Sequence, residues 1–196
     1  MVPRKFVDRG DFIEDGKWNY RHVRQFAYGD ETSYRRGMAF LDGHGAIEDW
    51  GCGTAWAKRF ATKSAYIGID VSKSRFADRV VDLRTYTSHA DCIFMRHVLE
   101  HNQDWKTILT NAVGSFRRRM ALVIYTPFGD ETRQIASWSG IPDISFREED
   151  LTDCFRHLRS SKEQLLTGTQ YGMERIFFIE KEPDEAPYAA PGSTPA

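Results

Sequence analysis

The stretch EDWGCGTAW, residues 48–56, decides the fold because its two glycines mark a bend between two elements. Gly51 and Gly53 follow a short strand-like run and precede AWAKRF, which is predicted to be a helix. Glycine at such a bend permits positive φ and lets the backbone approach a ligand closely. In open α/β sheets, ligands bind at the carboxyl ends of the strands. The stretch therefore predicts a ligand site at residues 49–54.

The residues around the bend narrow the class of ligand. Dinucleotide-binding folds use GxGxxG, whose third glycine allows close packing around a pyrophosphate, but Trp56 stands at that position here. The chain also lacks the GKS or GKT that a phosphate-binding loop needs. Asp70 ends the next apolar run, 17 residues after Gly53, where a carboxylate can accept both ribose hydroxyls. The pattern indicates a nucleoside-type ligand without a pyrophosphate.

Apolar runs and helical spacing alternate along the middle of the chain, which is typical of α/β architecture. A helix is predicted between residues 105 and 116, and RRR at residues 117–119 is interpreted as a solvated helix end. The sequence SFRE at residues 145–148 matches a capping box that would open another helix. Strands are predicted at residues 65–70, 79–83, 91–95 and 121–128.

Two further segments shape the predicted sheet. EQLLTGT and MERIFFIEK are strand-like runs joined through a turn at residues 170–172, which predicts an antiparallel hairpin at one edge. Only VSKSRFAD separates Asp70 from the third strand, whereas a crossover helix with its loops needs at least about 10–12 residues. The second crossover helix is therefore expected to be shortened or absent.

The glycine bend, the strand-end acids and the later motif VLEH together resemble the class I S-adenosylmethionine-dependent methyltransferases. The similarity extends over residues 46–181 and is carried by GCGT at 51–54, GID at 68–70, VDL at 81–83 and VLEH at 98–101. The resemblance implies a Rossmann-like α/β sheet, mostly parallel with an antiparallel C-terminal hairpin, and S-adenosylmethionine as cofactor. Ala55 replaces a glycine of the family's motif, but its methyl group is small and the cofactor is still expected to fit.

The resemblance also implies roles for the matching residues. Asp49 would bind the amino group of the cofactor, and Asp70 would take the ribose. Asp82 with Leu83 would meet the adenine edge, and the residues after the fourth strand would lie beside the sulfonium. The full set expected to bind the cofactor is Asp49, Gly51, Cys52, Gly53, Thr54, Asp70, Asp82, Leu83, Arg96 and His97.

Methyl transfer is an in-line displacement in which the protein aligns a nucleophile and removes its proton where it carries one. His97 and His101 are the candidate bases, because imidazole titrates near neutral pH. A packing or hydrogen-bonding role at the start of a helix is the other interpretation of both histidines. Asp130 and Glu131, with Glu100, would offer oxygen ligands to a metal ion or act as solvated loop acids; no metal site is predicted.

The chain is predicted to contain an N-terminal helical flap or lid at residues 1–43, a methyltransferase core at 44–181 and a disordered tail at 182–196. The flap is aromatic and basic, and either covers a sheet edge or closes over a ligand, with Asp30 as a helix cap. Residues outside the core would bind the acceptor: Tyr28, Tyr34 and Trp138 by stacking, and Arg21 or Arg24 by meeting an anionic group.

Composition limits the partners. The net charge is −1, so no global positive field draws the chain onto nucleic acid. Three cysteines without CxxC spacing, with no signal peptide and no apolar run of about 18 residues, predict a cytoplasmic protein without a membrane span. The expected activity is methyl transfer to an oxygen or nitrogen atom of a small-molecule or glycan-type acceptor. The alternatives are an RNA or protein methyltransferase, and a non-catalytic cofactor-binding regulatory or scaffold protein.

Overall fold

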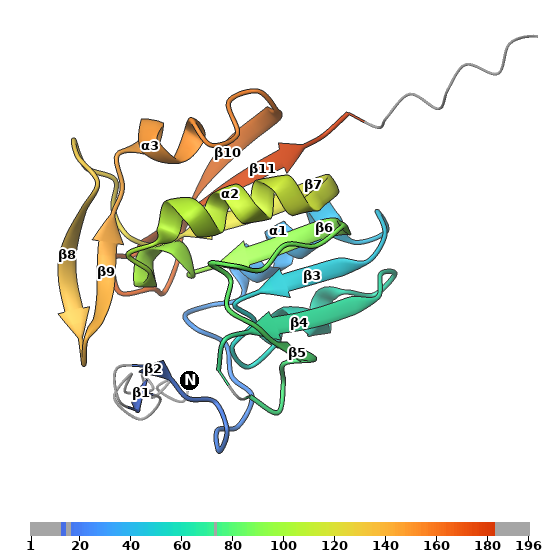
Figure 1. The fold of residues 1–196 in the computed structure, drawn as a ribbon, viewed down its shortest axis with the longest axis horizontal. Coiled ribbons are helices and arrows are strands. Elements are labelled where there is room, and N and C mark those ends of the chain that lie inside the picture. The colour runs from blue at the N-terminus through green and yellow to red at the C-terminus, as the bar shows by residue number, and fades with distance from the viewer. Residues whose placement is uncertain (1–12, 15–16, 73, 183–196) are drawn as a thin grey trace, which may run out of the picture.

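A computed structural model describes residues 13–14, 17–72 and 74–182 of the chain. Its main sheet has seven strands in the order β10-β11-β7-β6-β3-β4-β5. Strand β11 is antiparallel to both neighbours, and the pairs from β7 to β5 are all parallel. The expected α/β sheet, mostly parallel with an antiparallel C-terminal hairpin, is thus confirmed (Figure 1). The strands are β3 Ile47–Trp50, β4 Tyr66–Asp70, β5 Arg79–Val80, β6 Ala90–Arg96, β7 Phe116–Ile124, β10 Arg159–Leu166 and β11 Met173–Glu180.

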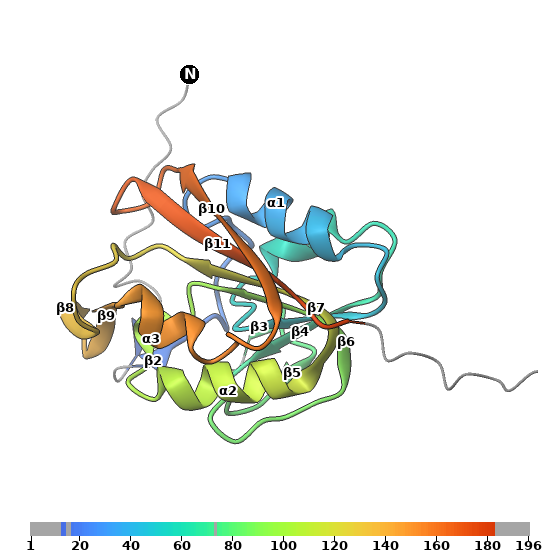
Figure 2. The same cartoon turned by 90° about the horizontal axis from the view of Figure 1, so that it is seen from above.

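Helices cover both faces of this sheet (Figure 2). Helix α1, Thr32–Leu41, lies on one face, and α2, Trp105–Ser115, and α3, Glu148–Thr152, lie on the other. Successive side chains of a strand point to opposite faces, and β6 follows this rule. Ile93 and Met95 join the apolar cluster of the α2 face, whereas Cys92 and Phe94 join that of the α1 face. The sheet is therefore the central layer of three.

The connections on the β5 side of the sheet are short. Between β3 and β4 the chain forms only a 3-10 helix, η2, at Trp56–Phe60. No helix lies among the described residues between β4 and β5 or between β5 and β6, which confirms the shortened second crossover. The loop at residues 81–89 packs there instead, and Glu48 holds it by accepting the Ser88 hydroxyl at 2.8 Å. Glu48 also accepts the Trp50 indole N–H at 3.0 Å, so this buried carboxylate is well satisfied.

The boundaries of β7 differ from the sequence prediction. The strand begins at Phe116, directly after α2, so residues 117–119 lie on a strand and not at a helix end. Parallel pairing with β6 draws this segment into the sheet, and Arg117 donates to Asp91 at 2.5 Å on the neighbouring strand. The strand ends at Ile124, four residues before the predicted end at residue 128.

The predicted capping box is also wrong. Ser145 ends a strand, where it pairs with Arg133, and its hydroxyl donates to the Pro127 carbonyl at 2.8 Å. It is therefore not available to cap a helix. Helix α3 starts only at Glu148, and its N-cap residue, Arg147, makes no side-chain capping bond.

Two small hairpins complete the fold: β1 Ile13–Glu14 with β2 Lys17–Trp18, and β8 Arg133–Trp138 with β9 Ile141–Ser145. The N-terminal segment has two parts. Helix α1 covers the sheet with Met38 and Leu41 fully buried, while residues 19–30 contain no helix. The N-cap residue of α1 is Glu31 and not the expected Asp30, which lies one residue earlier and accepts the Thr32 N–H at 2.8 Å. Residues 183–196 of the predicted tail lie outside the described residues, and no described helix meets the length and hydropathy of a membrane span.

Candidate active site

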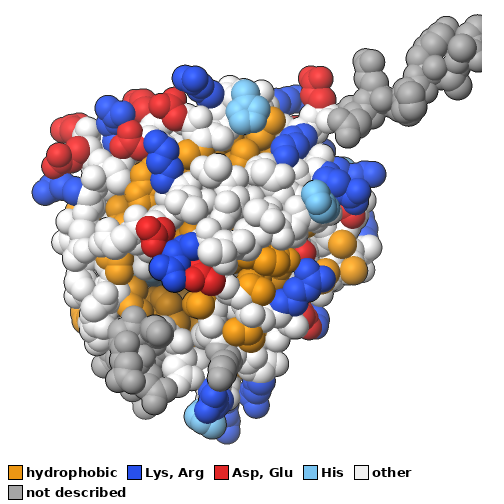
Figure 3. Space-filling view, in the orientation of Figure 1, with side chains coloured by type: hydrophobic (Ala, Val, Ile, Leu, Met, Phe, Trp, Pro, Cys, Tyr) orange, Lys and Arg blue, Asp and Glu red, His pale blue; other side chains and the backbone are white. Residues whose placement is uncertain are grey.

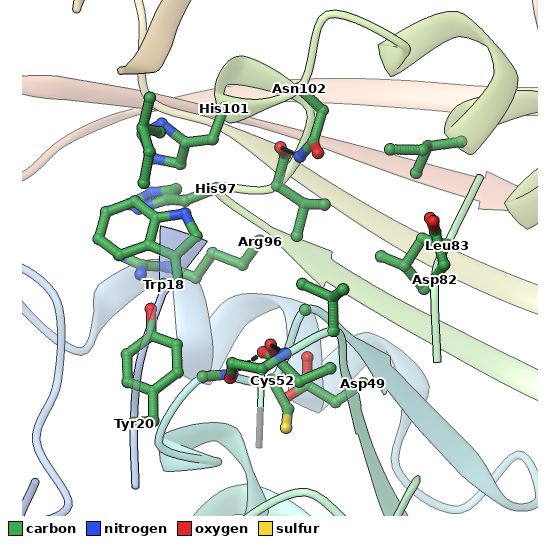
Figure 4. A pocket seen from close by; sticks show the side chains of 18 of the residues that line it. Trp18, Tyr20, Asp49, Cys52, Asp82, Leu83, Arg96, His97, His101 and Asn102 are labelled. Carbon is green, nitrogen blue, oxygen red and sulfur yellow. Dashed lines mark hydrogen bonds between the residues drawn. The ribbon is translucent and has the colours of Figure 1, made fainter. Parts of the chain in front are cut away.

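A cavity of about 670 Å³ opens at the carboxyl ends of β3, β4 and β6. In Figure 4, His97, His101, Trp18 and Tyr20 lie on one side of it, Asp82 and Leu83 on the other, and Asp49 and Cys52 between them. All ten residues expected to bind the cofactor line this one cavity, as do His101, Tyr28 and Tyr34. In Figure 3, apolar side chains are exposed on the lower left of the face shown, and charged side chains of both signs lie around them.

The glycine bend has the backbone that its sequence requires. Gly51 has φ 80° and Gly53 has φ 53°, both in the left-handed region that glycine adopts without strain. A Cβ on Gly51 would lie 2.3 Å from Val98, so close packing also demands glycine. Ala55 has φ 51°, a left-handed conformation that is costly for alanine and that explains the glycine of the family motif. The Trp56 indole points away and donates to Glu31 at 3.2 Å, so its bulk does not enter the cavity.

Asp70 braces the bend from the neighbouring strand. Its carboxylate accepts the Gly53 N–H at 2.8 Å and the Ser72 N–H at 2.8 Å. Burial raises the pKa of Asp70, although these N–H donors act in the opposite direction. A carboxylate has about four acceptor positions. The Asp70 carboxylate also interacts with the Ser72 hydroxyl and the Val71 N–H, and the residue lines this wall of the cavity.

Asp49 is the second buried carboxylate at the bend, with a residue exposure of 4%. The Tyr66 hydroxyl donates to it from the start of β4. Burial raises the pKa of Asp49 to about 7, and Asp70 adds to the increase while Tyr66 and Arg96 oppose it. Two neighbouring buried carboxylates create an environment that favours a cationic ligand.

The other predicted cofactor residues lie around this pair. Asp82 is fixed by Arg84, whose guanidinium donates at 2.6 Å, and this bond lowers the pKa of Asp82. Leu83 is buried beside it. Burial raises the pKa of the Cys52 thiol, which keeps it protonated. The Thr54 hydroxyl donates to the Phe26 carbonyl at 2.7 Å, which ties the N-terminal segment to the bend.

Arg96 links the end of β6 to three other elements. Its guanidinium donates to Glu174 on β11 at 2.6 Å, to Ser33 on α1 at 2.8 Å and to the Tyr28 carbonyl at 2.9 Å. It also lies 4.0 Å from the centre of the Tyr34 ring. Arg96 is therefore held in place in the wall of the cavity, and it contacts Tyr28 and Tyr34, the two tyrosines that were expected to bind the acceptor.

His97 and His101 are the cavity's two histidines. His97 Nε2 lies 2.5 Å from Glu174, and burial together with Arg96 lowers its pKa to about 3 despite that carboxylate. The His97 ring is therefore neutral. His101 Nδ1 lies 2.9 Å from the Pro142 carbonyl and 3.3 Å from Asp143.

Other predicted residues lie elsewhere. Trp138, half-exposed near the tip of β8–β9, is not in the cavity wall, although its cross-strand partner Ile141 is. Arg21 lines the cavity, whereas Arg24 does not. Asp130 and Glu131 are exposed. Glu100 is fully buried, and no group of three or more metal-binding side chains occurs in the described part of the chain.

Sequence reasoning did not identify four residues that build the site: Glu174, Asp143, Trp18 and Tyr20. Trp18 contacts His101 edge-on with ring centres 5.2 Å apart, and the Tyr20 ring lies next to Gly53. The aromatic composition of the flap contained this signal, but not which rings would reach the cavity. Glu174 and Arg175 are charged residues at the start of the strand-like run MERIFFIEK, and a charge in a predicted sheet strand was a usable signal.

No family model matches the chain, and no curated protein sequence matches it. Solved structures do. The 1,6-didemethyltoxoflavin-N1-methyltransferase of Burkholderia thailandensis, with bound 1,6-didemethyltoxoflavin and S-adenosylhomocysteine, superposes with TM-score 0.62 at 14% identity, over 79% of this chain and 80% of its own. The magnesium protoporphyrin IX methyltransferase of Synechocystis PCC 6803, with bound S-adenosylhomocysteine, superposes with TM-score 0.58 at 14% identity. The match covers 78% of this chain and 83% of that one. The [4+2]-cyclase SpnF superposes with TM-score 0.56 at 15% identity, and the match covers 84% of this chain and 87% of that one. The chain therefore has the fold of the class I S-adenosylmethionine-dependent methyltransferases.

Proposed function

We propose that the chain is an S-adenosylmethionine-dependent methyltransferase acting on an oxygen or nitrogen atom of a small-molecule or glycan-type acceptor. The observation that carries the proposal is the pair of buried carboxylates, Asp49 and Asp70, at the glycine bend. A nucleoside ligand that carries positive charge and no phosphate offsets the cost of burying these acids. Two of the solved structures with this fold contain S-adenosylhomocysteine, which supports the same ligand class.

The residues present fit this cofactor. When bound, S-adenosylmethionine supplies an electrophilic methyl group on a positively charged sulfur. Gly51 and Gly53 leave backbone accessible beside the ligand, with Cys52 and Thr54 completing the bend. Asp49 provides a carboxylate for the amino group, and Asp70, which also lines the cavity, provides one for the ribose hydroxyls. Asp82, already oriented by Arg84, and Leu83 form the wall proposed for the adenine.

The opposite side of the cavity is proposed to hold the acceptor. Arg96 and His97 lie between the two regions, and His101 faces the cavity beyond them. A general base within hydrogen-bond reach of the acceptor contributes typically about 10²–10⁴-fold to the rate. One of the two histidines is proposed to take this proton.

A small acceptor fits the site better than a macromolecule. The cavity volume of about 670 Å³ lies within the range of about 300–1,000 Å³ that is usual for small-molecule sites. Tyr28 and Tyr34 line it, so they are proposed to contact the acceptor directly. Trp138 stands outside the wall and would contact only a part of the acceptor that protrudes beyond Ile141.

Calorimetry with S-adenosylhomocysteine tests the cofactor assignment. Wild type is expected to bind, and Asp70→Ala should lose about 2–4 kcal/mol of binding free energy, because two charge-assisted hydrogen bonds disappear and do not fully add. Asp130→Ala, at an exposed acid outside the cavity, is the matched control and should bind as wild type does. Absence of binding by folded wild type would refute the proposal.

Methyl transfer itself needs a second experiment, because the cyclase SpnF shares the fold and the fold alone does not fix the reaction. Cell extracts incubated with the protein and methyl-labelled cofactor should yield labelled product that survives treatment with protease and with ribonuclease. Loss of label after either treatment would favour a protein or RNA acceptor. Cofactor binding without any transfer would favour a non-catalytic role. A cytoplasmic location stays a prediction.

A further inference from the structure

The β8–β9 hairpin adds a wall to the cavity that the seven-stranded sheet does not provide. Its turn residues, Ser139 and Gly140, have φ 48° and 86°, as in the tight two-residue turns that suit antiparallel hairpins. Gly140, Ile141 and Pro142 line the cavity, and β9 packs against η3, the 3-10 helix Leu99–His101. The hairpin therefore brings Asp143, the residue after Pro142, next to His101.

The tautomer of His101 follows from its hydrogen bond. Nδ1 lies 2.9 Å from the Pro142 carbonyl, and a carbonyl oxygen can only accept. Nδ1 therefore carries the proton, and Nε2 is left as the basic nitrogen of the neutral ring. The side chain is 9% exposed and lines the cavity, with the Trp18 ring edge-on at 5.2 Å. His101 thus presents a base to the region proposed for the acceptor.

Asp143 supports a positive charge on His101. Its Oδ1 lies 3.3 Å from His101 Nδ1, and its residue is completely buried. The Tyr125 hydroxyl donates to Asp143 at 2.5 Å and the Tyr171 hydroxyl at 3.4 Å, which offsets the cost of burying the carboxylate. A buried carboxylate behind an imidazole holds its orientation and stabilises the imidazolium that forms when the ring takes a proton.

His97 has a different environment, although it also faces a carboxylate. Its Nε2 is bonded to Glu174, and that carboxylate also receives the guanidinium of Arg96. The positive charge of Arg96 opposes a second positive charge on the adjacent ring. His97 is therefore suited to remain a neutral part of the wall.

We propose that His101, oriented by Asp143, is the general base of the reaction, and that the acceptor consequently presents an O–H or N–H nucleophile beside Trp18. The inference rests on the proposed methyl transfer. The lone pair of the acceptor oxygen or nitrogen forms the bond to the methyl carbon, and the carbon–sulfur bond breaks with its electron pair returning to sulfur. The proton of the acceptor passes to His101 Nε2 and then to water. Asp143 is a positioning residue, and His101 is the catalytic one.

Nitrogen NMR of the ¹⁵N-histidine-labelled full chain tests the pair without any acceptor. His101 is expected in the Nδ1–H form. Asp143→Asn should shift the ¹⁵N resonances of the His101 ring, because it removes the carboxylate that lies 3.3 Å from Nδ1. The other titratable groups around His101 in the described chain are Tyr125, His97 and Glu100. Asp130→Asn, at an exposed acid outside the cavity, is the matched control and should leave the His101 resonances unchanged.

Turnover provides the second readout, using labelled S-adenosylmethionine and an extract fraction that wild type methylates. His101→Gln should lower the rate about 10²–10⁴-fold at neutral pH. Asp143→Asn should lower kcat with little change in the KM for S-adenosylmethionine, because the carboxylate no longer orients His101 or stabilises its imidazolium. An Nε2–H tautomer in wild type, an unchanged kcat in folded Asp143→Asn, or full activity of His101→Gln would each overturn the proposal. Both variants should still bind S-adenosylhomocysteine, so lost binding by wild type marks failure of the proposed function instead.

Discussion

The buried carboxylate of Asp49 makes a quantitative prediction about cofactor binding and pH. Its pKa of about 7 in the ligand-free protein, raised by burial and by Asp70, means that it is half-protonated near neutrality. A ligand ammonium group interacts favourably only with the ionised form. Binding should therefore lower the Asp49 pKa and release a proton whenever the pH lies near or below 7.

The size of the effect follows from the fraction of Asp49 that is ionised. With a pKa of about 7, this fraction is about one tenth at pH 6 and about nine tenths at pH 8. The affinity for S-adenosylhomocysteine should therefore rise about 10-fold between these pH values, or about 1.4 kcal/mol. Folding stability should change with pH in the opposite direction from ligand affinity. Between pH 3.8 and 7 the ligand-free folded chain holds the Asp49 proton more tightly than the unfolded chain does. The contribution of Asp49 to the free energy of unfolding therefore falls as the pH rises.

Calorimetry at pH 6, 7 and 8, in buffers of different ionisation enthalpy, measures both the Kd and the number of protons released. Asp49→Asn should bind more weakly at pH 8 and lose the pH dependence. Asp82→Asn is the matched control, because Arg84 keeps the pKa of Asp82 low and Asp82 is ionised throughout this range. A wild-type Kd that stays flat from pH 6 to 8, or a slope retained in Asp49→Asn, would refute the reasoning.

Three further predictions concern stability. Glu174→Gln leaves the Arg96 side chain, which is 3% exposed, without its carboxylate partner. The free energy of unfolding, measured in urea, should therefore fall by about 3–5 kcal/mol. A decrease of less than about 1 kcal/mol would contradict this prediction. Ala55→Gly should raise the free energy of unfolding by about 1 kcal/mol, because glycine adopts φ 51° without strain. A lower free energy of unfolding in this variant would contradict the left-handed conformation of residue 55. Backbone N–H bonds, including that of Lys63, outweigh burial and lower the pKa of Asp42 to about 2. Asp42→Asn should therefore lower the free energy of unfolding by about 1–2 kcal/mol at pH 7. Unfolding measured between pH 4 and pH 2 should show this difference from wild type disappear as the wild-type carboxylate is protonated. A difference that persists at pH 2 would argue against the role of the carboxylate.

Local sequence patterns predicted the sheet well, because strand periodicity and glycine conformations act over short distances. The runs ending at Asp70 and at Met95 are strands, and the bend at Gly51 and Gly53 has the positive φ that its glycines imply. The failures occurred where a tertiary partner outcompeted a local signal. Ser145 carries a helix-capping pattern, but cross-strand pairing and a bond to Pro127 engage it in the hairpin.

The site was only partly accessible from the sequence for a related reason. The residues proposed to bind the cofactor follow individual strands, and a parallel sheet brings all strand ends of one direction to one edge. The partners of the histidines come from other parts of the chain, at Glu174 on β11 and Asp143 on β9. Both pairings depend on the order of strands and on the placement of an added hairpin. No spacing rule connects such residues before the topology is known.

The short crossovers explain how a reduced scaffold keeps a complete cavity. Crossover helices cover the faces of a sheet, whereas the cavity is built at the strand ends and closed by the N-terminal segment and the β8–β9 hairpin. The described chain has no helix between β4 and β6, and the apolar side chain of Val80 on β5 is 52% exposed, whereas Val71 at the end of β4 still lines the cavity. Glu48 compensates on this side by fixing the loop that packs over Trp50. The first acid of the glycine motif, Glu48, thus supports the sheet, while the second, Asp49, lines the cavity, because adjacent strand residues point to opposite faces.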